Sequence, residues 1–157
     1  GISENSVDRK LYYLYNTVRK CISYITQFRK EVRALISFAE FQMEDGTPIY
    51  LQIILYLKRG MVAGKIHDGD PLPSRRNLSA LLGVNPNTIQ KAYHMLEEEG
   101  LIASQSGAKS TVSVDPEKLL RVKQDLLDSD LKTVIAALKQ AGLSREEAIE
   151  LLKAHWN

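Results

Sequence analysis

The sequence predicts a mainly α-helical protein with one small β-hairpin. Apolar residues recur at steps of three and four over most of the chain, and Pro and Gly divide it into helix-length pieces. One pair of short strand-like runs flanks a polar tip near residue 107. At 157 residues, 44% hydrophobic and 25% charged, the chain has the composition of an ordinary globular protein. We therefore expect three segments: residues 1–40, 41–115 and 116–157.

The composition excludes several classes of protein. The single cysteine, Cys21, cannot form an intramolecular disulfide, and His67, His94 and His155 lie far apart without other ligands at metal spacing. We therefore expect no metal site and no cofactor. No uncharged apolar run reaches the roughly 18 residues of a membrane span, and the N-terminus lacks the pattern of a signal peptide. These features predict a cytoplasmic protein that does not enter the membrane.

The first segment, residues 1–40, has a heptad pattern. Residues 2–45 contain no Gly or Pro, so the pattern predicts a single helix of about 30 residues with an apolar seam that faces a partner helix. A solvated amphipathic helix with basic edges is the alternative, and contact of these edges with DNA is a third. The seam consists of Leu11, Leu14, Val18, Cys21, Ile25, Phe28, Val32, Leu35 and Ala39, and the basic residues are Arg9, Lys10, Arg19, Lys20, Arg29, Lys30 and Arg33.

Three helices are predicted before residue 100 in the segment 41–115. The first begins at Pro48, after the turn 45–48, and ends between Gly60 and Gly64. Its apolar face comprises Ile49, Ile53, Ile54 and Leu57.

The second and third predicted helices are separated by a short turn. Ser74 is a good cap for the second, which Gly83 ends. Asn85 caps the third, Pro86 occupies its first position, where the missing N–H costs nothing, and the helix runs to Glu99.

A β-hairpin follows these helices. Residues 101–105 and 110–114 read as two short strands around a polar tip at residues 106–109. Three helices followed by a hairpin, with a tight turn between the second and third helices, is the order of a winged helix-turn-helix domain. The sequence therefore predicts such a domain, of the kind that binds DNA, over residues 41–115.

The spacing of three residues supports a helix-turn-helix. Close crossing of its two helices requires a small residue at the contact, a turn residue free to adopt positive φ, and an apolar residue in the third helix; Ser79, Gly83 and Ile89 meet these needs. The third helix then has an inward face of Ile89, Ala92, Tyr93 and Leu96, and an outward face of Asn87, Thr88, Gln90, Lys91 and His94.

The outward face carries side chains that suit DNA. Asn and Gln can pair bidentately with adenine, Thr can contact a thymine methyl or a phosphate, and N–H groups at a helix N-terminus favour phosphate. Although the segment has a net charge of −1, we place Glu97, Glu98 and Glu99 at the far end of the third helix. The pattern gives the candidate DNA-binding residues Arg75, Arg76, Asn85, Asn87, Thr88, Gln90, Lys91 and Lys109.

In the last segment, residues 116–157, the pattern predicts two or three helices. Pro116 opens the first, Gly142 interrupts the apolar pattern, and Ser144 with Glu147 forms a capping box for the next. The segment is too short to enclose both a core and a ligand cavity of several hundred Å³. We therefore expect a helical dimerisation tail.

Residues 48–53, 69–78, 82–93 and 96–102 together resemble the DNA-binding domain of the GntR family of bacterial transcriptional regulators. The resemblance covers about residues 41–114. The short tail, with Gly-Leu-Ser-Arg-Glu-Glu at its second helix, resembles the YtrA-type subfamily, whose tail serves dimerisation. The resemblance also implies a first short strand at Phe41 to Met43, with the N-terminal helix ending near Ala39.

The resemblance implies a set of DNA contacts. The family's contacts correspond here to Arg76 in the second helix, to Asn87, Thr88 and Gln90 in the third, and to Ser106 and Gly107 in the hairpin, which is the wing of the fold. The wing departs from the family pattern because the residues after Gly107 are Ala, Lys and Ser, without a second glycine. The N-terminal helix has no counterpart in the pattern.

Together these observations predict a homodimeric, sequence-specific regulator, a repressor that binds an inverted repeat of double-stranded DNA. A protein-interaction module that has lost DNA binding is the alternative, supported by the altered wing and the charge of the middle segment. An enzyme is not expected, because no nucleophile, base and orienting acid stand at a recognisable spacing. The N-terminal helix would extend the dimer or join dimers into tetramers, and any small-molecule effector stays unidentified.

Overall fold

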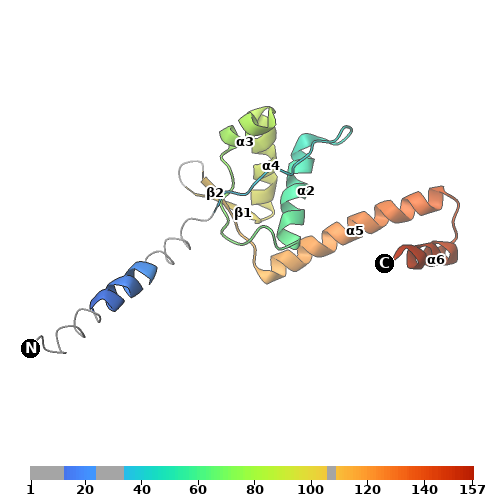
Figure 1. Cartoon of the computed structure of the whole chain (residues 1–157). Coiled ribbons are helices and arrows are strands. Elements are labelled where there is room, and N and C mark those ends of the chain that lie inside the picture. The colour runs from blue at the N-terminus through green and yellow to red at the C-terminus, as the bar shows by residue number, and fades with distance from the viewer. Residues whose placement is uncertain (1–12, 24–33, 106–108) are drawn as a thin grey trace, which may run out of the picture. The chain divides into compact units, whose positions relative to one another are not determined.

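The computed structural model describes residues 13–23, 34–105 and 109–157. The chain divides into two units, Gly1–Leu35 and Ile36–Asn157. In the first unit, residues 13–23 are helical. The second contains, in order, α2 (Ile49–Val62), α3 (Arg75–Leu82), α4 (Pro86–Glu98), β1 (Ile102–Gln105), β2 (Lys109–Val112), α5 (Pro116–Gln140) and α6 (Arg145–His155), as Figure 1 shows.

The predicted fold class is confirmed: the protein is mainly helical with a two-stranded antiparallel sheet. The helix boundaries follow the predicted caps closely. Ser74 caps α3, Asn85 caps α4, and Gly83 has a φ of +65°, a left-handed conformation that glycine adopts without a steric penalty. The tail forms two helices, and the capping box between Ser144 and Glu147 is present.

The cap of α3 gives a first testable prediction. The Ser74 hydroxyl accepts a hydrogen bond from the backbone N–H of Asn77 at 3.1 Å. Ser74→Ala leaves that N–H without its partner, so we expect the free energy of unfolding to fall by about 0.5–2 kcal/mol in a denaturant titration. Ser74→Asp retains an acceptor and is the control. Equal losses in both variants would contradict this role of the hydroxyl.

The core of the second unit lies between α2, α4, the sheet and the start of α5. Ile53, Leu57, Leu78, Ile89 and Leu96 are fully buried in it. From α5, only Val122 and Leu126 are buried, both in its first half. The beginning of α5 therefore completes the core of the helix-turn-helix domain.

The wing sheet is extended by neighbouring backbone. Ile102 pairs with Val112 and Gln105 with Lys109 across the two strands. On the other side of β2, the loop before α3 lies alongside: Leu72 N–H donates to Ser110 O at 2.9 Å. Ile36 N–H in turn donates to Pro71 O at 3.0 Å. The chain that leads into the domain is thus joined to the wing through this loop.

The N-terminal segment differs from the prediction at its end. Residues 34–38 have no regular secondary structure, so the expected helix does not reach Ala39. Ile36 and Phe38 are buried in the core, whereas Leu35, an expected seam residue, is 59% exposed. The expected strand at Phe41 to Met43 is absent as well.

Aromatic packing accounts for this difference. The ring of Phe38 lies 5.0 Å from that of Tyr56 on α2, and Phe41 lies 5.3 Å from Tyr56. The Tyr56 hydroxyl also donates to Ser37 O at 2.8 Å. Burial of Phe38 and its contacts with α2 favour the irregular backbone of residues 36–38 over the local helical pattern. The folded unit therefore begins at Ile36, earlier than the predicted boundary at residue 41.

Candidate nucleic-acid interface

The polar side of α4 is open to solvent at its N-terminal end. Asn87 and Gln90 are exposed, as predicted for the outward face, whereas Thr88 is partly buried. The opposite side, with Ile89, Ala92, Tyr93 and Leu96, is buried. Because these apolar residues fix the rotation of the helix about its axis, the polar residues at its start face outward together.

The contact between α3 and α4 has the predicted helix-turn-helix geometry. The hydroxyl of Ser79, a buried residue of α3, donates to Val84 O in the turn at 2.6 Å. Gly83 takes the left-handed conformation, and Ile89 is fully buried beneath the turn. These three residues hold the two helices in close contact.

Tyr93 fixes α4 against the loop that leads into α3. Its buried hydroxyl donates to Pro73 O at 2.8 Å. Burial raises the pKa of Tyr93 well above its usual value, and nearby Arg75 lowers it by a smaller amount. The phenol therefore stays neutral and keeps its proton for this hydrogen bond.

The two arginines that open α3 have different environments. Arg76 is exposed, in the first turn of the helix. Arg75 is partly buried: its guanidinium lies 5.9 Å from the centre of the Tyr93 ring, and Nη2 is 3.6 Å from Glu97 Oε1. Arg75 is thus engaged within the domain, while Arg76 is available at the surface.

Glu97 corrects the placement of the acidic cluster. The sequence pattern placed Glu97, Glu98 and Glu99 away from the DNA-facing residues. In the structure, however, Glu97 contacts Arg75 at the start of α3 and accepts a hydrogen bond from Ser104 Oγ of β1. The reason is geometric: α3 and α4 meet at a turn, so the start of α3 approaches the end of α4. Glu97 lies four residues after Tyr93 on the same face of α4, and Arg75 contacts both side chains.

Asn85 and Lys91 also make contacts within the domain. Asn85 Oδ1 accepts a hydrogen bond from Asn87 N–H at 2.8 Å, which is its capping role. Lys91 Nζ lies 3.8 Å from the centre of the Tyr50 ring on α2, a cation–π contact that the sequence analysis missed. Both side chains remain exposed beside the polar end of α4.

Of the three candidate DNA-binding residues in the wing, one lies within the residues that the structure describes. Lys109 begins β2, opposite Gln105, and is exposed. Ser106 and Gly107, the other two wing candidates, lie outside the described residues. Ser104 and Ser110, the cross-strand pair next to Gln105 and Lys109, have their hydroxyl oxygens 3.3 Å apart.

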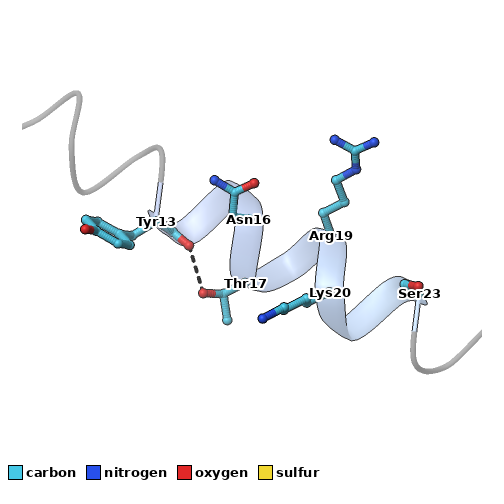
Figure 2. Close-up of a pocket in the computed structure, with 6 residues that line it drawn as sticks. All are labelled: Tyr13, Asn16, Thr17, Arg19, Lys20 and Ser23. Atoms are coloured by element: carbon cyan, nitrogen blue, oxygen red, sulfur yellow. Dashed lines mark hydrogen bonds between the residues drawn. The ribbon is translucent and has the colours of Figure 1, made fainter.

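The helical residues 13–23 do not form a comparable site. Figure 2 shows a hollow lined along this one helix, in which Asn16 and Arg19 point to one side and Thr17 and Lys20 to the other. Thr17 Oγ1 donates to Tyr13 O at 2.8 Å within the helix. The side chains diverge, so the hollow has no convergent polar groups for a small ligand.

Among residues 13–23, 34–105 and 109–157, no three His, Cys, Asp or Glu side chains gather as metal ligands would. No helix of the described ranges combines the length and the apolar character needed to cross a membrane.

A helix-turn-helix with an exposed polar helix end, next to a two-stranded wing, defines a winged helix-turn-helix protein. Residues 49–112 match the family of bacterial regulatory proteins named gntR. The chain is 37% identical over 110 residues to the HTH-type transcriptional repressor YtrA of Bacillus subtilis, covering 69% of this chain and 85% of that repressor. It is 32% identical over 112 residues to the regulator YhcF of Bacillus subtilis, covering 71% and 93%.

A solved structure agrees with these similarities. A GntR family transcriptional regulator from Listeria monocytogenes superimposes with a TM-score of 0.63 at 32% identity, over 71% of this chain and 98% of that one. The protein belongs to the GntR family, and its similarity to YtrA agrees with the short helical tail. It is a DNA-binding transcriptional regulator, and its relatives are regulators, not enzymes.

Proposed function

We propose that the protein is a repressor that binds an inverted-repeat operator as a homodimer. The observation that carries the proposal is a second apolar face on α5, which the described residues leave uncovered. A dimer formed through this face would place one recognition helix α4 in each of two half-sites.

The two apolar faces of α5 lie on opposite sides of the helix. Val122, in the core, and Leu131 are nine residues apart, which is about two and a half turns at 3.6 residues per turn. Leu131 is 55% exposed. The same exposed side carries Leu120, Leu127, Val134 and Ile135, at heptad-like steps.

The tail also continues the apolar surface beyond α5. In α6, Ile149, Leu151 and Leu152 are exposed, and no residue of this helix is buried. A helix of this length is marginal without tertiary packing. A second copy of the chain supplies that packing, which makes the two tail helices the dimerisation surface in this proposal.

In the DNA complex, the main contacts belong to Arg76, Asn87, Thr88 and Gln90. The exposed Arg76 faces the phosphate backbone, and the polar end of α4 enters the major groove. Supporting roles belong to Lys91, Asn85, Lys109, Ser106 and Gly107. Arg75 has an indirect role, because its guanidinium already contacts Glu97 and the ring of Tyr93. It supports the interface by holding Glu97 in place.

Repression follows from occupancy of the operator. YtrA, which is similar to 69% of this chain, is named a repressor.

The N-terminal unit adds a further surface: Leu14 and Val18 are exposed on the helix of residues 13–23. Such a seam extends the dimer or joins dimers into tetramers, and light scattering of the full chain distinguishes these states.

Selection of binding sites from a random duplex pool tests this proposal directly. The full chain is used at near-physiological salt, and we expect enrichment of an inverted repeat. No enrichment, together with no salt-dependent binding, would contradict the proposal and favour a protein-interaction module, because phosphate contacts release counterions and produce a salt slope.

The roles of two residues on α4 can be separated by mutation. Asn87→Ala removes a base-reading amide, so we expect a loss of about 1–3 kcal/mol on the selected site and relaxed specificity at one base pair. Lys91→Ala should weaken binding to all sequences alike and flatten the salt slope. Fluorescence anisotropy on specific and random duplexes measures both. An equal loss on the two duplexes for Asn87→Ala, or a loss confined to the specific duplex for Lys91→Ala, would contradict these roles.

A further inference from the structure

An ion pair holds α5 against α2 at the point where α5 leaves the core. Arg59, in the last turn of α2, donates through Nη1 to Asp130 Oδ2 at 3.0 Å and through Nη2 to Asp130 Oδ1 at 2.8 Å. Asp130 lies one helical turn after Leu126, the last buried residue of α5. The next residue, Leu131, belongs to the exposed apolar face.

The pair is bidentate, and its two side chains are about half exposed. Two parallel N–H···O bonds between planar groups define an orientation as well as a distance. The hydrogen bond from Arg59 lowers the pKa of Asp130, so the carboxylate is charged at neutral pH. Nearer its start, α5 is fixed by Lys118, whose ammonium donates to Gly100 O at 2.7 Å, and by Val122 and Leu126 in the core.

A small rotation at this point has a large effect further along the helix. From Asp130 to the end of α5 at Gln140 is ten residues, or about 15 Å at 1.5 Å per residue. A change of about 15° in direction would therefore move the end of α5 by about 4 Å, slightly more than the roughly 3.4 Å between base pairs.

We propose that the Arg59–Asp130 pair sets the direction of α5 relative to the helix-turn-helix domain and thereby the half-site spacing that the dimer accepts. The inference rests on the proposed dimer through the tail helices. Arg59 and Asp130 are positioning residues: they act through the placement of α4 in the two half-sites, without contact to DNA.

The test measures affinity as a function of spacing. Duplexes carry the selected half-sites at the selected separation, at separations one and two base pairs shorter or longer, and as one half-site alone. For the unchanged full chain we expect at least a tenfold loss at each altered spacing. For Asp130→Asn we expect a three- to tenfold loss at the selected spacing, a flatter spacing profile, and unchanged binding to a single half-site.

Two further variants make the result specific. The charge exchange Arg59→Asp with Asp130→Arg should restore much of the spacing preference. Glu40→Gln breaks the exposed pair between Glu40 and Lys65, whose charged atoms are 3.8 Å apart outside the tail helices, and should leave the profile unchanged.

The outcomes separate this inference from the proposed function. A dimer that prefers one spacing equally in the unchanged chain and in Asp130→Asn overturns the inference alone. A monomer, or an unchanged chain without any spacing preference, overturns the proposed function and the inference together. Loss of single half-site binding in Asp130→Asn would also overturn the positioning role, because it would place the defect within the domain.

Discussion

Leu131→Asp should convert the regulator into a monomer and lower its affinity for the two-half-site operator by about 10²–10⁴-fold. Leu131 is exposed in the single chain, so the substitution does not disturb the core, but it places a charge in the apolar face of α5. A monomer loses the high effective concentration that links binding at one half-site to binding at the other. Light scattering gives the mass, and fluorescence anisotropy gives the affinity.

The neighbouring residue provides a matched control for this substitution. Lys132→Asp introduces the same acid on α5 at an exposed position outside the apolar face. It also changes the charge by more than Leu131→Asp does, so a purely electrostatic effect on DNA binding would be larger in the control. We expect Lys132→Asp to remain dimeric. A dimeric Leu131→Asp with unchanged operator affinity would show that α5 does not form the interface.

Leu57→Ala is expected to reduce the free energy of unfolding by about 2–5 kcal/mol, because it leaves a cavity in the centre of the core. Leu57 is 0% exposed on α2, the helix that carries both Tyr50 and Arg59. A denaturant titration measures the loss. Leu55→Ala, on the same helix but 39% exposed, should cost clearly less. Equal losses at the two positions would contradict the packing of α2 described above.

The sequence predicted those parts of the fold that depend on local interactions. The ends of α3 and α4 follow from Ser74, Gly83, Asn85 and Pro86, because each cap involves residues within one turn. The buried face of α4 follows from helical periodicity, with Ile89 as the residue beneath the turn. These local signals also place Asn87 and Gln90 on the exposed side.

Contacts between distant residues could not be predicted in this way. Arg59 and Asp130 are 71 positions apart, and no local pattern connects them. Phe38 continues a chain with helical periodicity, yet its burial against Tyr56 decides the backbone at residues 36–38. Arg75 shows the same limit for the DNA interface: its type suits phosphate, but Glu97 and Tyr93 engage it in the folded domain.

The chain that precedes α2 has a practical consequence for dissecting this regulator. Ile36 and Phe38 fill the core, and Ile36 N–H bonds to the loop that lies along the wing. A fragment cut at residue 41, where the sequence pattern alone places the start of the domain, would lose two interior side chains and this backbone link. The shortest piece suitable for DNA-binding studies should therefore include Ile36, with its amide still part of a peptide bond.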